Sequence, residues 1–228
     1  RQSDVTEIHV VPLYPQFADA TTGSTERKVL DVIAKEEKRS SGKIKLTFAK
    51  DFFDHPLFVE AWSRMIPANA KDHGAHVVFS FHGLPESQVR KNKSCEINSS
   101  CCHQSPTPRC YRAQSLRTAH AIAEKAELRP HQYSIAFQSR LGRQKWLEPS
   151  TDHTIAEKAK MGTKKLFVLC PSFVTDCLET LEEIGMGQKE NFLEHGGQEF
   201  HLIPSLNAEP FGERGVAARG CRHCPAAV

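Results

Sequence analysis

The sequence has 228 residues and a formal net charge of +3, from 30 basic and 27 acidic side chains. This length can bury a hydrophobic core in one large domain or two smaller ones, so its size requires no disulfide staple. The charges are spread without a dense basic run or an arginine and aromatic stripe, which argues against a nucleic-acid partner. The longest apolar runs are far shorter than the roughly 20 residues of a membrane-spanning helix.

The N-terminal residues show neither a methionine nor the basic and apolar regions of a secretory signal. We therefore expect a cytoplasmic, reducing environment, where clustered cysteines bind metal more often than they form disulfides. Eight cysteines are also too few for a disulfide scaffold in a chain of this size. Cys170 and Cys177 flank a predicted strand end and helix start, and we expect both to be reduced.

Short apolar runs alternate along the chain with longer amphipathic runs. The predicted strands are 7–14, 43–49, 75–81, 132–137, 165–170 and 199–204. The predicted helices are 25–39, 56–74, 111–128, 152–160, 175–185 and 191–197. This alternation indicates an α/β fold in which helices cover parallel sheets. The strand runs are almost continuously hydrophobic, as expected of strands that are buried on both faces.

One histidine lies where such folds bind their ligands. In open α/β sheets, ligands bind beyond the carboxyl ends of the strands. His82 follows the predicted strand 75–81 and precedes Gly83 and Pro85, which should end the strand and turn the chain. The imidazole is therefore expected beside a ligand crevice, and a hydrogen-bonded histidine that merely caps the strand is the alternative.

Acidic residues lie along one face of the predicted helix that follows the strand 165–170. Asp176 and Glu179 are favoured there by the helix dipole, by a few tenths to about 1 kcal/mol, so helix capping alone can explain them. Glu179 and Glu183 are four residues apart, however, and would repel each other by a few tenths of a kcal/mol in an α-helix. A cation bound along this face would offset that repulsion.

Four aromatic residues, Tyr14, Phe17, Trp146 and Phe173, fall in the same class of loops. They are either core aromatics or the lining of an apolar slot for a flat aromatic ligand. A slot with a base on one wall and carboxylates on the other suits metal insertion into a macrocycle, because two pyrrole protons leave as a divalent cation arrives. A base with a pKa near neutral takes the protons, and acids guide the hydrated cation.

Five segments, in order, resemble motifs of the ferrochelatase family, whose members insert ferrous iron into a porphyrin in the last step of haem synthesis. They are 10–24, 79–85, 137–152, 170–184 and 203–210. The resemblance implies a chelatase-like fold of two Rossmann-like domains, the first incomplete in this chain. The expected division is the end of the first domain at 1–40, a second domain at 41–206 with a cysteine-rich insertion at 94–111, and a C-terminal segment at 207–228.

The resemblance also implies roles for individual residues. His82 and Glu179 match the family's catalytic pair, which holds iron or handles the pyrrole protons, and both assignments of these two roles stay open. The implied metal ligands are His82, Glu179, Asp176 and Glu183, and the implied porphyrin contacts are Tyr14, Arg140, Trp146 and Phe173. The chain departs from the family at Cys177, where histidine is usual, at Gly83, where serine is usual, and at Gly187, where a third acid would stand.

Half of the cysteines lie in the insertion, at Cys95, Cys101, Cys102 and Cys110. Some ferrochelatases hold a 2Fe-2S cluster mainly through a C-terminal extension, with one ligand from the segment where this chain has Asp19. The tail here offers only Cys221 and Cys224, whereas a subset of bacterial members has internal cysteines. Four thiolates suffice for a 2Fe-2S cluster or for tetrahedral zinc, and the adjacent Cys101 and Cys102 do not easily pair with each other.

The resemblance therefore predicts a ferrochelatase with an internal 2Fe-2S cluster, with zinc and free or disulfide-bonded cysteines as alternatives for the thiols. The reaction inserts ferrous iron into protoporphyrin and releases two protons. A chelatase for coproporphyrin or sirohydrochlorin, or an inactive fragment that binds an iron–sulfur cluster, are alternative functions. The expected partners are a porphyrin and haem; the apolar product is compatible with peripheral membrane contact, and the sequence sets no oligomeric state.

Overall fold

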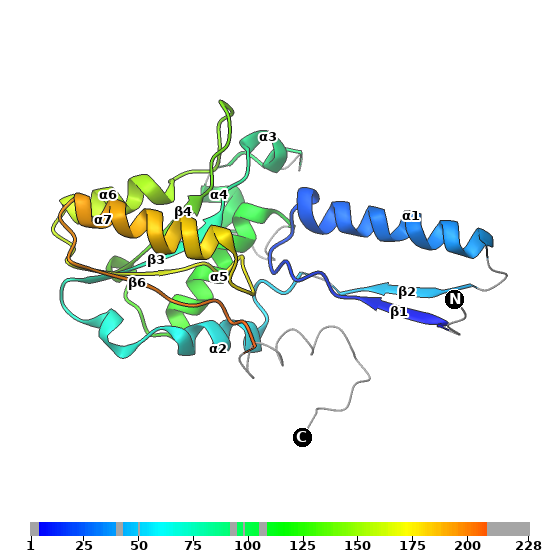
Figure 1. The fold of residues 1–228 in the computed structure, drawn as a ribbon, viewed down its shortest axis with the longest axis horizontal. Coiled ribbons are helices and arrows are strands. Elements are labelled where there is room, and N and C mark those ends of the chain that lie inside the picture. Colours follow the sequence, from blue (N-terminus) through cyan, green and yellow to red (C-terminus); the bar gives the residue numbers. More distant parts are fainter. Residues whose placement is uncertain are drawn as a thin grey trace, which may run out of the picture.

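The computed structural model describes residues 5–39, 43–49, 51–91, 95–97, 99–104 and 109–208. Its main sheet has four parallel strands in the order β4-β3-β5-β6. They are β3 (Ala75–His82), β4 (Tyr133–Gln138), β5 (Lys165–Leu169) and β6 (Glu199–Leu202). Helices lie on both sides of this sheet (Figure 1), which confirms the predicted α/β class.

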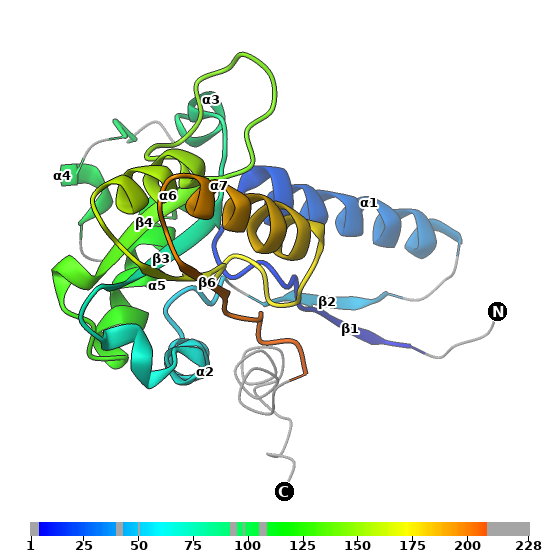
Figure 2. The ribbon, with the colours of Figure 1, turned by 60° about the vertical axis from the view of Figure 1, so that its left-hand side comes forward.

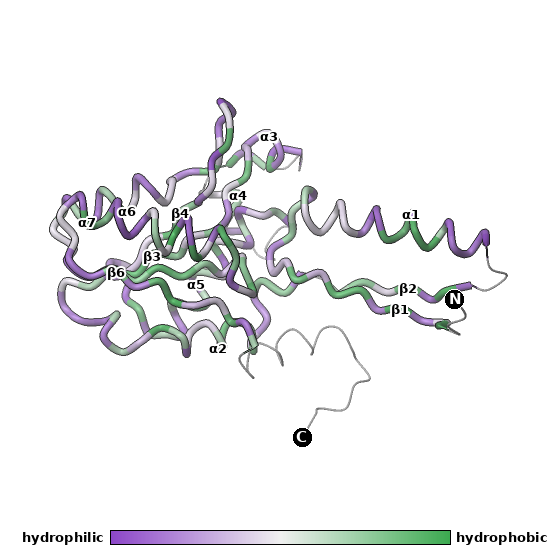
Figure 3. The backbone as a smooth tube through the Cα atoms, in the orientation of Figure 1, coloured by the Kyte–Doolittle hydropathy of each residue, from purple (hydrophilic) through white to green (hydrophobic). Residues whose placement is uncertain are grey.

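The central strand β3 supplies side chains to two hydrophobic cores. Successive residues of a strand point to opposite faces of its sheet, so Phe79 and Phe81 pack in one core and Val78 packs in the other. Figure 3 shows the same concentration of hydrophobic residues along the central strands. The first core includes residues of α2 (Pro56–Met65) and α5 (Tyr111–Lys125); the second includes residues of α6 (Thr151–Lys160) and α7 (Lys189–Glu194).

A second, smaller sheet pairs β1 (Glu7–Val10) with β2 (Lys45–Phe48) in parallel. A π-helical turn, η1 (Asp19–Gly23), leads into α1 (Ser24–Arg39), which lies alongside these two strands. Figures 1 and 2 both show this unit projecting from the main body. β2 lies beyond the predicted boundary at residue 40 yet pairs with β1, and the division of the chain into domains stays a prediction.

Two helices differ from their predicted spans. The helix predicted over 56–74 ends at Met65, because Pro67 favours an extended conformation at Ile66, whose ψ is 114°. The helix predicted over 175–185 is a π-helix, η4 (Glu179–Gln188), and π-helical segments are frequent at functional sites. The remaining short elements are η2 (Ala68–Lys71), α3 (Glu86–Val89), α4 (Ser99–Cys102) and η3 (Pro130–Gln132).

The strand order places a ligand crevice beside His82. From β3 the chain continues to β4 on one side, and then crosses to β5 and β6 on the other side. The direction of winding therefore reverses between β3 and β5, and open α/β sheets bind ligands beyond the carboxyl ends of strands at such a point. His82 is the last residue of β3. Within the described ranges, no helix combines the length and the apolar character needed to cross a membrane.

Candidate functional site

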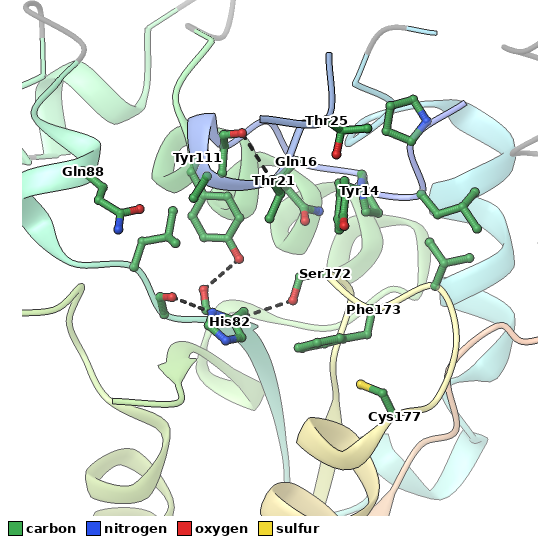
Figure 4. Close-up of a pocket in the computed structure, with 18 of the residues that line it drawn as sticks. Tyr14, Gln16, Thr21, Thr25, His82, Gln88, Tyr111, Ser172, Phe173 and Cys177 are labelled. Atoms are coloured by element: carbon green, nitrogen blue, oxygen red, sulfur yellow. Dashed lines mark hydrogen bonds between the residues drawn. The ribbon is translucent and has the colours of Figure 1, made fainter. Parts of the chain in front are cut away.

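A cavity of about 860 Å³ opens at this reversal point. This volume lies within the roughly 300–1,000 Å³ of typical small-molecule sites. Its walls come from the segment after β1 and from the loops that follow β3, β4 and β5 (Figure 4). Four of the residues expected in the site line it together: Tyr14, His82, Trp146 and Phe173.

Hydrogen bonds fix both the backbone and the ring of His82. Its backbone N–H donates to Ser172 Oγ at 3.0 Å, and its ring Nδ1 lies 2.6 Å from the carbonyl oxygen of Gly83. Because a carbonyl only accepts hydrogen bonds, Nδ1 is the donor, and in the neutral imidazole Nε2 therefore carries the lone pair. The ring centroid lies 6.1 Å from that of Phe173. The imidazole is thus held in a fixed orientation beside an aromatic wall of the cavity.

Tyr111 and Ser172 line the cavity and were not among the expected site residues. The Tyr111 hydroxyl donates to the backbone oxygen of His82 at 2.7 Å, which Figure 4 shows together with the Ser172 contact. Burial raises the pKa of Tyr111 above its usual range, so the hydroxyl stays protonated and able to donate. Both contacts join segments that are far apart in the chain, and local sequence patterns carry no signal for such contacts.

Glu179 lies in the first turn of η4, outside the cavity lining but electrostatically coupled to His82. A hydrogen bond from the Cys177 thiol is the main cause that lowers the pKa of Glu179, and attraction by His82 lowers it further. Cys177 itself lines the cavity. The Glu179 carboxylate is therefore ionised at neutral pH and is linked to the cavity through this thiol.

Asp176 ties the loop after β5 to the segment that follows β6. Its carboxylate accepts hydrogen bonds from the Ser205 backbone N–H at 3.0 Å, Asn207 Nδ2 at 2.8 Å and Thr180 Oγ1 at 3.2 Å. Burial would raise the pKa of Asp176, but these donors outweigh burial and lower it. This carboxylate therefore links two segments of the chain, and it does not line the large cavity.

Glu183 and Arg140 also make contacts away from the large cavity. The Glu183 carboxylate accepts hydrogen bonds from the backbone N–H of Ser139 at 2.7 Å and from the Ser139 hydroxyl at 2.5 Å. It is therefore bound to the loop after β4 and is not left unpaired next to Glu179. Arg140 Nη2 lies 2.5 Å from Glu148 Oε1. Glu183 and Arg140 instead line a smaller polar cavity of about 190 Å³.

The four insertion cysteines, which we call the cysteine cluster, lie close together without converging on one point. The described cysteines form no disulfide bonds, and Cys101 Sγ lies 3.8 Å from Cys102 Sγ. Cys95 interacts with both Cys110 and Cys101. In the part of the chain that the structure describes, no three or more His, Cys, Asp or Glu side chains are arranged to hold a metal ion. Four thiols are the right kind and number of ligands for an iron–sulfur cluster, but their positions in this structure do not form a metal site.

Burial and one arginine set the charge state of these thiols. Burial raises the pKa of Cys95 to about 11 and also raises that of Cys102, while Arg112 opposes the shift at Cys102. Arg112 Nη1 donates to Cys102 Sγ at 2.9 Å, and its buried Nε has no hydrogen-bond partner among the described residues. The guanidinium therefore favours negative charge on sulfur at this point. Cys221 and Cys224 lie outside the described residues.

Comparisons with known proteins agree with the sequence motifs. A sequence model of the family described as Ferrochelatase matches residues 1–219. A ferrochelatase of Bdellovibrio bacteriovorus is 45% identical over 220 residues, which cover 95% of this chain and 64% of the relative. A ferrochelatase of Stutzerimonas stutzeri is 43% identical over 211 residues, which cover 89% of this chain and 60% of the relative. The chain thus spans less than two thirds of the length of these curated relatives.

A solved structure shares the fold. SirB from Bacillus subtilis, determined with Fe3+, matches with a TM-score of 0.57 and 16% sequence identity, and the match covers 95% of this chain and 71% of that chain. At this identity the likeness supports the chelatase-like fold alone, and the family assignment rests on the sequence matches, which extend over nearly the whole chain. The chain belongs to the ferrochelatase family.

Proposed function

We propose that this protein inserts ferrous iron into protoporphyrin and releases two protons, the reaction that its family name describes. One observation carries the proposal: the free Nε2 of His82 and the rings of Tyr14, Trp146 and Phe173 share one cavity. Aromatic walls suit a flat macrocycle, and an imidazole is the side chain best suited to take protons near neutral pH.

In the proposed mechanism His82 accepts protons and Glu179 attracts the ferrous ion. The porphyrin lies against the aromatic side chains. His82 Nε2 accepts the two pyrrole protons one after the other, and it releases the first to solvent before it takes the second. Glu179 is ionised and attracts the ferrous ion toward the ring. Each iron that binds the four ring nitrogens displaces two pyrrole protons, so charge balances without any change in the oxidation state of iron. A positioned base of this kind typically contributes 10²–10⁴-fold to the rate.

The further expected contacts require rearrangement. Asp176 and Glu183 would bind the cation only by exchanging their present hydrogen bonds for it. Arg140 would reach a porphyrin carboxylate only after leaving Glu148. We therefore propose His82 and Glu179 as the primary pair, with Asp176 and Glu183 as ligands along the approach of the ion and Arg140 as a contact at the rim.

Variants of the complete protein test the pair. Iron insertion, followed as the loss of porphyrin fluorescence, is expected to fall at least about 100-fold in His82→Ala and in Glu179→Gln. The matched control is His76→Gln, because His76 lies on the same strand but outside the large cavity. Insertion at the wild-type rate by His82→Ala would exclude this residue as the base.

The tetrapyrrole substrate is tested separately. Protoporphyrin, coproporphyrin and sirohydrochlorin are offered to the complete protein under the same conditions, and insertion is expected to be most efficient with protoporphyrin. Activity on sirohydrochlorin alone would identify a chelatase of another type. Insertion preferred with coproporphyrin would keep the mechanism and change the substrate.

We further propose that the cysteine cluster binds a 2Fe-2S cluster. The support is that four thiols lie close together and that the Arg112 guanidinium favours negative charge on the Cys102 sulfur. Binding requires the thiols to converge further than they do here. Protein purified without oxygen is expected to show visible iron–sulfur absorption that Cys102→Ser loses and Cys177→Ser keeps, because Cys177 lies outside the insertion. A colourless protein would contradict this proposal.

A further inference from the structure

The cysteine cluster and the cavity are joined by two consecutive residues. Cys110 precedes α5 directly, and Tyr111 is the first residue of this helix. Cys110 is 6% exposed and Tyr111 is 8% exposed, so the protein core encloses both side chains. Tyr111 lines the large cavity, whereas Cys110 interacts with Cys95 in the insertion.

The carboxyl end of β3 is pinned by three hydrogen bonds from different elements. Gly83 N donates to the Gln138 oxygen at 2.6 Å, His82 N donates to Ser172 Oγ at 3.0 Å, and Tyr111 donates to the His82 oxygen at 2.7 Å. The first partner is the last residue of β4, and the second lies in the loop after β5. Of these three hydrogen bonds, only the one from Tyr111 comes from α5, the helix that Cys110 directly precedes.

A change at Cys110 has a short route to His82. The backbone oxygen of Cys110 accepts the Gln114 N–H at 2.9 Å, which makes Cys110 part of the first turn of α5. A bond from the Cys110 sulfur to a new partner would act on the backbone that begins α5, one residue before Tyr111. A tyrosine side chain has few rotatable bonds, so a shift of its backbone moves its hydroxyl as well.

We propose that Tyr111 is a positioning residue through which the cysteine cluster controls the geometry of His82. The inference rests on the proposed role of His82. It assigns to the cysteine cluster an effect on the active site that passes through Tyr111. The state of the thiols then changes turnover through one hydroxyl, while the aromatic ring of Tyr111 still lines the cavity.

A double-mutant cycle on the complete protein tests this coupling. The variants are Tyr111→Phe, Cys110→Ser and the double variant, with Cys95→Ser as a second perturbation of Cys110. The main readout is hydrogen exchange of the backbone amides in residues 79–85, which requires neither turnover nor a bound cluster. Exchange in β5 reports global stability, and Tyr133→Phe is the matched control, because its hydroxyl instead contacts His120.

Each single variant at Tyr111 or Cys110 is expected to raise exchange at His82 about tenfold, the effect of one hydrogen bond, and the double variant is expected to add little. Tyr111→Phe should lower kcat by a similar factor and leave KM nearly unchanged. Additive effects, or unchanged exchange at His82 in both Cys110→Ser and Cys95→Ser, would overturn the inference. The proposed function fails separately, if His82→Ala inserts iron normally while the exchange coupling persists.

Discussion

Single residues in this site are held by partners that lie far away in the sequence. His82 could be predicted, because a histidine between an apolar strand and a glycine-proline turn marks a strand end. The hydrogen bonds of Asp176 and Glu183 could not be predicted, because their donors lie far away in the sequence. Ser139 donates to Glu183, and the segment after β6 donates to Asp176. A count of carboxylates therefore overestimates how many are free to meet a cation.

Ser139 gives a test at this scale. Its φ is +60°, a left-handed conformation that costs a residue with a side chain roughly 1–2 kcal/mol, and the Glu183 carboxylate binds both its N–H and its hydroxyl. Ser139→Ala loses the hydroxyl bond and keeps the strained backbone, whereas Ser139→Gly loses the bond and relieves the strain.

We expect Ser139→Gly to unfold with a free energy about 1 kcal/mol higher than that of Ser139→Ala, measured by urea denaturation. A glycine variant that is less stable than the alanine variant would show that the left-handed backbone is not strained. Gly187, in η4, has a backbone without positive φ, and Gly187→Ala serves as the opposite control, expected to be neutral or stabilising.

At the scale of elements, the alternation of strands and helices was predictable, but the form of the helix that carries Glu179 was not. Hydrophobic periodicity predicts a helical segment at 175–185, and it does not distinguish α-helical from π-helical hydrogen bonding over so few residues. The end of β3 is likewise set by neighbouring strands. A Cβ on Gly83 would lie 2.6 Å from the Gln138 backbone oxygen and 3.2 Å from Trp146.

This contact explains why glycine follows His82 in this chain. Gly83→Ser is expected to lower the free energy of unfolding by about 1–3 kcal/mol, because backbone atoms must move to admit the Cβ. Urea denaturation measures the change, with Gly187→Ala as the control, since its nearest atom would lie at 3.8 Å. Wild-type stability of Gly83→Ser would mean that the loop after β4 adjusts without cost.

The strand β3 also gives the fold a dependence on pH. Burial, helped by the positive charge of Lys158 and by His131, lowers the pKa of His76 to about 4 from its ordinary value near 6.5. Between these two values the unfolded chain binds more protons than the folded chain, so stability falls as the pH falls from about 6.5 to 4.

His76→Gln is expected to remove this part of the acid sensitivity, which amounts to at most about 3 kcal/mol. Urea denaturation at pH 7 and pH 4.5 measures the difference, and His153→Gln, at an exposed position of α6, is the control. An unchanged pH dependence in His76→Gln would show that His76 is not the residue responsible.

At the scale of the whole molecule, the site is assembled from segments spread over most of the chain. The cavity combines the segment after β1 with loops after β3, β4 and β5, and the order of the strands explains why these loops meet. The motifs indicated which loops matter. They could not indicate that Tyr111 joins the cavity, because its position depends on how α5 packs against the sheet.

The most direct test of the central claim is to locate the porphyrin. Trp146 lines the cavity and Trp62 is fully buried elsewhere in the core. Protoporphyrin titrated into the complete protein is expected to quench tryptophan emission, and the part of the quenching that belongs to Trp146 should be absent in Trp146→Phe. Equal quenching in the two proteins would place the porphyrin outside this cavity and contradict the site proposed for it.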